Sequence, residues 1–342
     1  MGLVLVMNAG STSVKLRLVD EDGAATAIDS PDDAPAGVEA VGHRIVHGGE
    51  RFRAPALLDD ATLDELDDLS ALAPLHNGPA LELAREARRR FADVPHVAAF
   101  DTAFHATIPE EATTYAVPRA WREDWDIRRY GFHGLSVQWA AEQVPVAQLV
   151  VCHLGGGCSV SAVRDGRSID TTMGFSPLEG VPMATRAGSL DAAAILYLLR
   201  SGAATLEEID ETLERESGLL GLSGISGSVE ELEQTGDPAA RRALDVYCYR
   251  VACAVGSLAV ALGGLDAIAF TGGVGEGSAF VRAQVCSRLA LLGVELDAER
   301  NEAVPPPAEL APAGSRVRVV VVPAREDVVA ARAVRRVLAD RA

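Results

Sequence analysis

Two segments of the chain repeat one pattern, and this repeat constrains the fold more than any other feature. Residues 3–18 place an Asn-Ala-Gly-Ser-Thr-Ser turn between two apolar runs, and residues 149–163 place His-Leu-Gly-Gly-Gly-Cys-Ser between two others. The second unit is followed by an Arg-Asp-Gly-Arg hairpin turn at 164–167. Each unit predicts a strand, a Gly/Ser turn and a second strand, and each could open one domain. We therefore expect a duplicated chain, although two unrelated hairpins would give the same pattern.

The remaining pattern is an alternation of strands and helices, which predicts the α/β class. The chain has 342 residues, enough for about two domains. Beyond the repeats, apolar runs predict strands at 41–46, 96–100, 267–270 and 316–322. Helical periodicity predicts helices at 61–72, 79–91 and from 326 to the end. Residues 20–37 and 304–314 are expected to be surface connections, because they are rich in Pro, Ala and Gly.

Composition narrows the possible partners and the compartment. The net charge of −18 argues against nucleic acid or an anionic membrane, but a small anionic ligand remains possible. The longest uncharged stretch, 251–265, has 15 residues, whereas a membrane span needs about 20, so we expect a buried core helix there. No signal-peptide pattern opens the chain. The five cysteines include no Cys-x-x-Cys pair, which is typical of reduced thiols in the cytoplasm.

Two glycine-rich turns could approach a phosphate or a nucleotide. Lys15, the only lysine in the chain, follows the first hairpin turn. Turn N–H groups with a mobile ammonium beside them suit a phosphate, whereas a lysine on a surface strand needs no ligand. Residues 270–278 separate a predicted strand from a helix and permit close approach to a nucleotide. This segment contains Gly-x-Gly without the full dinucleotide spacing, so it is a weak signal alone.

Two arginines stand where an anion is the natural partner. Arg44 lies in an apolar strand, and a buried arginine needs an anion because an unpaired charge in a core is costly. Arg186 lies among small residues that shield it little. Either could instead form a salt bridge with one of the 49 acidic residues. If both converge, they would stabilise charge on a transferring phosphoryl group.

Acidic groups and a histidine add further candidates. Asp101 ends an apolar strand, where ligands bind in open α/β sheets, and it could equally cap a helix. His133 lies in a glycine-rich stretch, and no second histidine stands at metal-ligand spacing. Glu326 and Asp327 begin the last helix, where carboxylates could cap the helix or hold Mg2+ through water.

Taken together, these segments resemble the acetate kinase family. The matching strings occur in family order between residues 3 and 332: VLVMNAGSTSVK, GHRIVHGG, LAPLHNGPAL, AAFDTAFHATIP, RRYGFHGLS, HLGGGCSV, DTTMGFSPLEGVPMATRAG, LSGISG, FTGGVGEGS and VPAREDVVAAR. The resemblance implies the actin/Hsp70/sugar-kinase fold: two duplicated, ribonuclease H-like domains with a cleft between them. We expect residues 1–103 with 328–342 to form an N-terminal domain for the acyl substrate and phosphate, and 104–327 to form the nucleotide-binding domain.

The resemblance also implies a reaction. It is reversible phosphoryl transfer from ATP to acetate, or propionate, with Mg2+ or Mn2+, giving acyl phosphate and ADP. A carboxylate is already a nucleophile at neutral pH, so the catalytic problem is its repulsion from the phosphate. We further expect a cytoplasmic homodimer whose ligands are a small carboxylate and a nucleotide.

Residue by residue, the resemblance implies four sets of roles. Catalysis would fall to Asp101, Arg44, His133 and Arg186, and Arg44 would also hold the substrate carboxylate. The small acyl pocket would consist of Val46, Leu75, Phe132 and Pro177. The nucleotide would be bound by Lys15, by His153, Leu154, Gly155, Gly156 and Gly157, by Ser228, Val229 and Glu230, and by Gly273, Val274, Gly275, Glu276 and Gly277. The metal would be placed by Asn8 and Glu326.

The chain departs from the family pattern mainly on the nucleotide side. Gly156 and Gly277 each stand where the family has asparagine, and Ser228 to Glu230 stand where it has Asp-x-Arg. The family's Thr-Asn-Glu-Glu becomes Ala-Arg-Glu-Asp at 324–327, and the chain is short between the first hairpin and Arg44. These changes leave open another donor, such as pyrophosphate or another nucleotide, or a longer acid such as butyrate. A weakly active regulator that binds nucleotide or acyl phosphate is the alternative outside catalysis.

Overall fold

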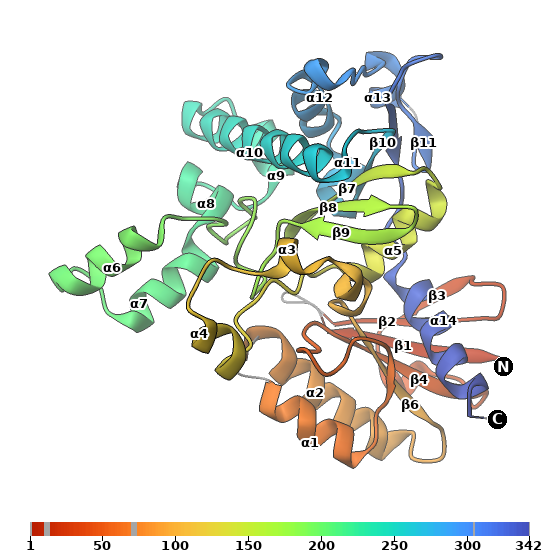
Figure 1. The fold of residues 1–342 in the computed structure, drawn as a ribbon. Helices are drawn as coiled ribbons and strands as arrows, with labels where there is room; N and C mark the ends of the chain where they lie inside the picture. Colours follow the sequence, from red (N-terminus) through yellow and green to blue (C-terminus); the bar gives the residue numbers. More distant parts are fainter. Residues whose placement is uncertain (1, 10–13, 70–73, 304, 342) are drawn as a thin grey trace.

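The computed structural model describes residues 2–9, 14–69, 74–303 and 305–341, with only the backbone course for 74–76. Two six-stranded sheets organise the molecule, one in its lower and one in its upper half (Figure 1). The first sheet has the order β3-β2-β1-β4-β6-β5: β1 (Leu3–Ala9), β2 (Val14–Val19), β3 (Ala25–Ile28), β4 (Val38–Ile45), β5 (Ala56–Leu57) and β6 (His96–Phe100). The second has the order β11-β12-β10-β7-β8-β9: β7 (Gln148–Leu154), β8 (Cys158–Arg164), β9 (Arg167–Thr171), β10 (Ala267–Thr271), β11 (Ala308–Glu309) and β12 (Arg318–Val321).

The two sheets have the same topology. In the first, β1, β2 and β3 form an antiparallel meander, β4 and β6 continue parallel to β1, and β5 closes the edge antiparallel. In the second, β7, β8 and β9 form the meander, β10 and β12 follow in parallel, and β11 closes the edge antiparallel. Each sheet therefore matches the other strand for strand. The predicted α/β class and the duplication are confirmed.

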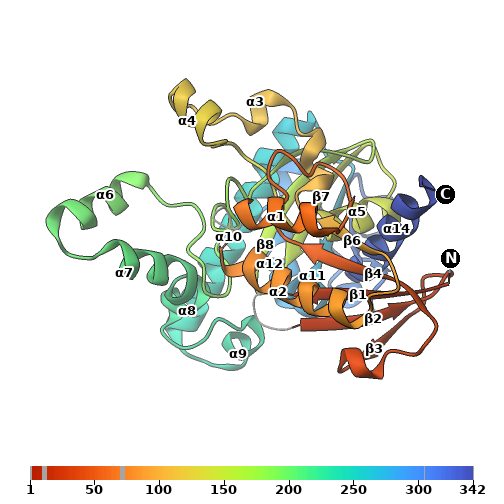
Figure 2. The same cartoon turned by 90° about the horizontal axis from the view of Figure 1, so that it is seen from below.

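Helices cover the sheets and connect them. They are α1 (Asp60–Asp68), α2 (Pro74–Arg90), α3 (Glu110–Thr113), α4 (Arg119–Asp124), α5 (Gly134–Gln143), α6 (Ala192–Ser201), α7 (Leu206–Glu211), α8 (Gly218–Ser223), α9 (Val229–Gln234), α10 (Pro238–Leu262), α11 (Gly272–Gly277), α12 (Ala279–Ser287), α13 (Ala298–Ala303) and α14 (Glu326–Ala339). A π-helical turn, Thr212–Glu216, follows α7. Helices α6 and α7 form an arm that projects from the body of the molecule (Figure 2).

The core of the second half is built around α10. Asp237 caps its N-terminus, and Tyr247, Val251 and Val255 are fully buried in one apolar cluster with β7, β8 and β10. Among the described residues, α10 is the one helix long and apolar enough to span a membrane, and half of that window is buried inside the protein. The core helix predicted at 251–265 is confirmed, although it begins earlier.

Helix α14 returns the end of the chain to the first sheet. It leaves β12 of the second sheet, and Val329, Ala330 and Val334 pack against Val4 and Val6 of β1. Both termini consequently lie together (Figure 1). All strands of the first sheet fall within residues 3–100 and all of the second within 148–321. The domain boundaries at 103/104 and 327/328 stay a prediction.

Three segments differ from the sequence-based expectation. Residues 20–37 were expected as a loop but contain β3, which has no buried residue and so gives little apolar signal. Residues 304–314 contain β11, followed by the buried Leu310 and Ala311. The expected glycine loop at 273–277 is helical as α11, because Glu276 Oε1 accepts hydrogen bonds from the Gly272 N–H at 3.0 Å and from the Ala324 N–H at 2.9 Å.

Candidate active site

A cavity of about 770 Å³ lies between the two halves and is lined from both sheets. The duplication explains its polar lining. In the first sheet, Asn8 of β1 lies in register between Lys15 of β2 and Arg44 of β4. In the second, His153 holds the matching position of β7, next to β8 and β10. Both sets of strand ends face the cavity, as open α/β sheets place ligands.

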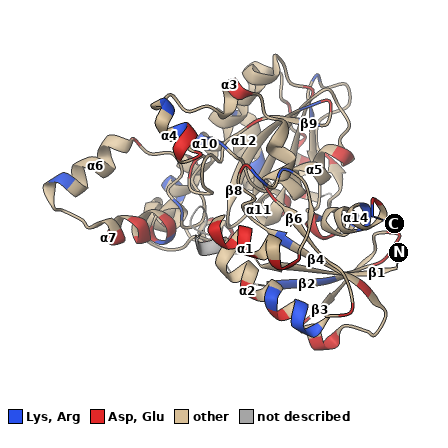
Figure 3. Cartoon of the chain, turned by 60° about the horizontal axis from the view of Figure 1, so that its bottom comes forward, with Lys and Arg blue, Asp and Glu red and all other residues tan. Residues whose placement is uncertain are grey.

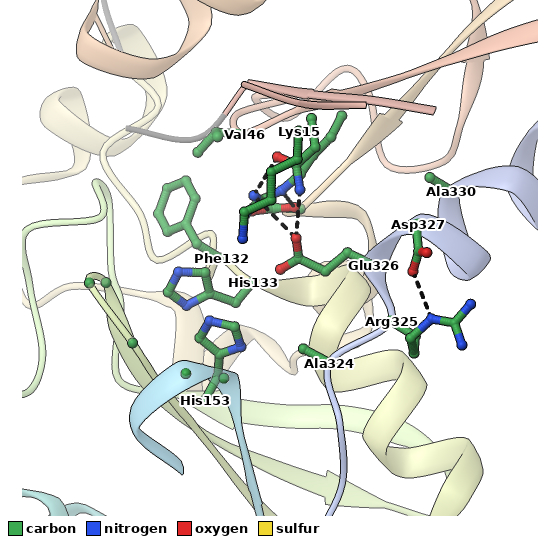
Figure 4. A pocket seen from close by; sticks show the side chains of 18 of the residues that line it. Lys15, Val46, Phe132, His133, His153, Ala324, Arg325, Glu326, Asp327 and Ala330 are labelled. Carbon is green, nitrogen blue, oxygen red and sulfur yellow. Dashed lines mark hydrogen bonds and ion pairs between the residues drawn. The ribbon is translucent and has the colours of Figure 1, made fainter. Parts of the chain in front are cut away.

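Arg44 is the centre of a buried ion-pair network at this cavity. Its Nε donates to Asp101 Oδ1 at 2.8 Å and its Nη2 to Oδ2 at 2.6 Å, a bidentate pair. Its Nη1 donates to Asn8 Oδ1 at 2.9 Å and lies 3.3 Å from Glu326 Oε2. The Asn8 amide in turn donates to Glu326 at 2.8 Å. Figure 4 labels Glu326 of this network, and dashed lines there mark the contacts of its carboxylate.

The charges in the network support one another. Burial lowers the pKa of Arg44, but Asp101 and Glu326 outweigh burial and raise that pKa above its usual value. Burial raises the pKa of Glu326, but Arg44 and His153 outweigh burial and lower it. Burial raises the pKa of Asp101, and Arg44 opposes that rise. Because both oxygens of Asp101 accept from one guanidinium, we treat this pair as ionised at neutral pH.

His133 and His153 stack on each other at the cavity wall, with ring centroids 4.2 Å apart (Figure 4). His133 Nδ1 lies 3.0 Å from Ser159 Oγ, and His153 Nδ1 lies 2.8 Å from Ser136 Oγ. Burial, followed by the neighbouring charges, lowers the pKa of His133 well below 6.5. Burial lowers the pKa of His153 to about 4. Both rings are therefore neutral at neutral pH.

The backbone around His133 explains the local glycine. His133 has φ 58°, a left-handed conformation that is uncommon for a residue with a side chain and that clusters at functional sites. It precedes α5, and the Gly134 N–H donates to the Asp101 carbonyl at 3.1 Å. A Cβ on Gly134 would lie 2.0 Å from that carbonyl. Only glycine lets α5 approach the end of β6 this closely.

The predicted acyl pocket is assembled in part. Val46, Phe132 and Pro177 line the cavity, and all three are buried. Leu75 lies in α2, but its side chain is outside the described part of the chain. Sequence reasoning missed His47, whose ring packs at 5.3 Å from Phe132 and whose Nε2 lies 3.3 Å from the Phe175 carbonyl. His47 directly follows Val46 in the sequence, and this adjacency was the available signal.

Arg186 reaches the cavity from the loop that precedes α6. A Cβ on Gly157 would lie 3.1 Å from His133 Nε2 and 3.6 Å from Arg186 Nη1, so both nitrogens flank the same point. The Ala184 N–H also donates to the Gly156 carbonyl at 3.2 Å, which ties the arginine loop to the second glycine turn. The four predicted catalytic residues, Arg44, Asp101, His133 and Arg186, all line one cavity.

The residues predicted to bind the nucleotide fall into two groups, those that line the cavity and those that do not. Those that line the cavity are Lys15, His153, Gly155, Gly156, Gly157, Gly273 and Glu276. Others do not line it: Leu154, Ser228, Val229, Glu230, Val274, Gly275 and Gly277. Leu154 and Val229 are core residues, and Ser228 caps α9 by accepting from the Glu231 N–H. The first hairpin turn, 10–13, lies outside the described residues.

The cavity is cationic in a strongly acidic chain. Five basic side chains line it against four acidic ones: Lys15, Arg17, Arg44, Arg186 and Arg325, with Asp101, Glu276, Glu326 and Asp327. Elsewhere Asp and Glu gather on outer helices such as α1 and α7 (Figure 3). Sequence reasoning missed Arg17, although its spacing of two from Lys15 on β2 places both on one face. The site suits anionic ligands against the field of the whole protein.

Two matching α/β halves that enclose a cationic cavity with a small apolar wall define a class: duplicated phosphotransferases that act on a small anion. The model of the Acetokinase family matches residues 26–332. The acetate kinase of Leifsonia xyli subsp. xyli is 41% identical over 388 aligned positions, covering 97% of this chain and 98% of that protein. The acetate kinase of Micrococcus luteus is 42% identical and covers 96% and 98%.

Solved structures agree. A propionate kinase from Francisella tularensis has a TM-score of 0.89 at 32% identity, covering 97% of this chain and 99% of that one. The Porphyromonas gingivalis acetate kinase has a TM-score of 0.86 at 31% identity, covering 99% and 100%. The chain belongs to the acetokinase family, an enzyme family that phosphorylates carboxyl groups. The predicted family, fold and enzyme class are confirmed.

Proposed function

We propose that the protein catalyses reversible, Mg2+-dependent phosphoryl transfer between ATP and acetate or propionate, giving acyl phosphate and ADP. One observation carries this proposal. Arg44, Asp101, His133 and Arg186 converge on a single cavity beside an apolar wall of Val46, Phe132 and Pro177. A guanidinium next to a small apolar surface fits a short carboxylate, since one end of that ligand is charged and the other is not.

Arg44 is proposed to hold the acceptor carboxylate. Asp101 occupies the Nε and Nη2 edge of its guanidinium, and Asn8 occupies one Nη1 hydrogen. With Glu326 also 3.3 Å from Nη1, the guanidinium is fixed in orientation before the substrate arrives. Asp101 acts here by orienting Arg44, and it has no proton to take because the acceptor is already ionised at neutral pH.

Arg186 and His133 are proposed to stabilise the transferring phosphoryl group. Charge on that group spreads over its equatorial oxygens in the transition state, and preorganised donors are effective there. Because His133 is neutral, it contributes a ring N–H rather than a charge. Ser159 fixes the ring through Nδ1, and Nε2 is the nitrogen that faces Gly157.

The family implies a divalent metal, which we assign to Asn8 and Glu326. Within the residues described, no group of three His, Cys, Asp or Glu side chains could hold an ion alone. One carboxylate with an amide nonetheless suits Mg2+, which takes most of its ligands from water and substrate phosphates. When bound, Mg2+ (or Mn2+) would neutralise charge on the donor phosphates.

The identities of the carboxylate acceptor and of the phosphoryl donor are less closely determined than the type of reaction. One methylene changes discrimination by only about 1–3 kcal/mol, so acetate and propionate fit alike, and butyrate remains an alternative. On the donor side, Ser228 to Glu230 and Gly277 do not line the cavity, and Gly156 offers no side chain. This observation favours a second candidate, a chain that accepts pyrophosphate or another nucleotide besides ATP. A weakly active regulator is the remaining alternative.

One assay separates these candidates. The purified chain is incubated with Mg2+, hydroxylamine and a panel of donors (ATP, GTP, pyrophosphate) against acetate, propionate and butyrate, and acyl phosphate is trapped as the hydroxamate. We expect product with ATP and with both shorter acids. Product with pyrophosphate alone would refute ATP as the donor. Lack of product with every pair would refute the enzyme and favour the regulator.

We also propose a homodimer that functions in the cytoplasm. Helix α6 has no buried residue and exposes Leu196, Tyr197, Leu198 and Leu199. A cavity of about 730 Å³ opens at the base of the same arm. The exposed arm of one copy and this cavity of a second copy could therefore pack together, as a two-fold interface requires. Light scattering should give twice the chain mass, and Tyr197→Asp should shift the measured mass toward that of the monomer.

The proposed compartment rests on a separate observation. All five cysteines are free, which suits a reducing compartment.

A further inference from the structure

The arm formed by α6 and α7 also contacts the active site, through the side of Arg186 that faces away from the cavity. Arg186, whose terminal nitrogens line the cavity side, has its Nε 3.0 Å from Glu214 Oε2. The two side chains are only 10% and 16% exposed. This pair joins the loop before α6 to the π-helical turn after α7, a kind of turn found frequently at functional sites.

Backbone hydrogen bonds brace the ion pair on both sides. Thr185 Oγ1 donates to the Glu214 carbonyl at 2.9 Å. The Ala187 N–H donates to the Leu213 carbonyl at 3.0 Å, and the Ser217 N–H donates to the Thr185 carbonyl at 2.9 Å. The two segments therefore move as one unit, and the carboxylate of Glu214 is not a mobile surface group.

The edge of the Arg186 guanidinium that Glu214 contacts determines which nitrogen is turned toward the cavity. A carboxylate at Nε contacts the guanidinium on the edge opposite to Nη1 and therefore does not compete for that nitrogen. On the cavity side, Nη1 points toward Gly157 and His133 and donates to the Met183 sulfur at 3.8 Å, a weak acceptor. Charge attraction acts in the same direction, because Glu214 opposes the effect of burial on the Arg186 guanidinium.

We propose that Glu214 is a positioning residue for phosphoryl transfer. It holds the Nε edge of Arg186, so that Nη1, which faces Gly157 and His133, meets an equatorial oxygen of the transferring group without reorganising. The inference rests on the proposed function, because it gives Arg186 a role in the transition state. Nothing in the sequence indicates it, since Glu214 stands in an acidic stretch 28 positions after Arg186.

A double-mutant cycle tests this role. The variants are Glu214→Gln, Arg186→Ala and the two combined, assayed by hydroxamate trapping with saturating ATP. Glu211→Gln is the matched control, because Glu211 is exposed on the same arm and, among the described residues, pairs with Arg215 in a surface contact at 3.4 Å. Thermal unfolding of each variant checks that the fold is retained. If Glu214→Gln does not fold, Glu214→Asp replaces it, since Asp keeps the charge and shortens the reach.

The expected result has two parts. Glu214→Gln lowers kcat about tenfold or more, with both KM values within about threefold, because a transition-state contact is lost. In the Arg186→Ala background the same change lowers kcat by less than about twofold, because residues that act as a unit are not additive. Glu211→Gln leaves kcat unchanged.

Two results would overturn the inference. One is a kcat of Glu214→Gln or Glu214→Asp within twofold of the parent. The other is a full, additive loss when Glu214→Gln is added to Arg186→Ala, which indicates a general structural role. An inactive parent chain would refute the proposed function instead, so the two failures are distinguishable.

Discussion

Lys15 differs from the other cations of the cavity in how it is held. Arg44 and Arg186 are fixed by carboxylates, whereas the Lys15 side chain is exposed on β2 and faces the cavity from its rim (Figure 4). A flexible ammonium binds phosphate as a point charge rather than through a set geometry. Such a contact strengthens donor binding about equally in the ground state and the transition state.

Lys15→Ala should therefore raise the KM for the phosphoryl donor about fivefold to tenfold, which corresponds to about 1 kcal/mol. We expect kcat and the carboxylate KM to stay within about twofold, measured by steady-state kinetics over both substrates. Lys15→Arg keeps the charge and serves as the matched control, with a donor KM near that of the parent. An unchanged donor KM in Lys15→Ala would exclude this contact.

Residue types were predictable from the sequence, but their pairings were not. An arginine on an apolar strand indicated that Arg44 needs an anion, and that need is met by Asp101, 57 positions away. The bond from Asn8 to Glu326 joins positions 318 apart. Such pairs depend on how two sheets and α14 come together, which no local pattern encodes. Glu214 illustrates the same limit, because its acidic neighbours are equally suited to a solvated helix face.

At the scale of elements, α8 shows why the arm and the Arg186 loop fit together. Gly218 begins this helix with φ +60°, and a Cβ there would lie 2.2 Å from the Met183 carbonyl and 2.8 Å from the Arg186 carbonyl. The Leu219 N–H donates to the Met183 carbonyl at 2.8 Å. Helix α8 thus packs backbone to backbone against the loop that carries the catalytic arginine.

Two glycines at the ends of α8 allow the energetic cost of backbone strain to be measured separately from the cost of losing this close approach. Gly224 ends the helix with φ +66° and has no atom within 4 Å of its added Cβ. Gly224→Ala should cost about 1 kcal/mol from the left-handed backbone alone. Gly218→Ala should cost about 3 kcal/mol or more, and lower kcat, because it also displaces the Arg186 loop. Urea unfolding with parallel assays measures both, and equal losses in the two variants would contradict the packing argument.

Elements were predicted best where a strong apolar pattern was present. The strand predicted at 96–100 appears with those bounds, and the two predicted hairpins open matching sheets. Strand β3 was missed because an exposed edge strand carries no apolar run. The glycine segment at 273–277 was misassigned as a loop because its helix depends on Glu276, whose carboxylate bridges to Ala324 of a distant segment.

For the whole molecule, folding buries histidines as well as apolar groups, both within each half and at the shared cavity. All six histidines whose side chains the structure describes have pKa values lowered first by burial: His43, His47, His96, His105, His133 and His153. His105 is a clear case, with Nδ1 2.8 Å from Ser168 Oγ, Nε2 2.9 Å from the Phe132 carbonyl and a pKa of about 4.

This burial predicts the acid sensitivity of the fold. A histidine with a pKa of about 4 when folded and about 6.5 when unfolded binds more protons in the unfolded chain between those values. Its stabilising effect is complete above pH 6.5 and is lost as the pH falls toward 4, by about 1.4 kcal/mol per pH unit for each such group. The free energy of unfolding, from guanidinium titrations, should therefore fall steeply between pH 7 and pH 5.

The variant His105→Gln tests how much of the pH dependence of the free energy of unfolding comes from a single histidine. Gln keeps a donor for the Phe132 carbonyl but cannot titrate, so the loss of stability between pH 7 and pH 5 should be smaller than in the parent by about 2 kcal/mol. Ser168→Ala is the matched control, since it removes the Nδ1 partner and leaves the ring able to titrate. A parent whose stability is flat over this range, or a His105→Gln slope equal to that of the parent, would show that buried neutral histidines do not set the acid limit of this fold.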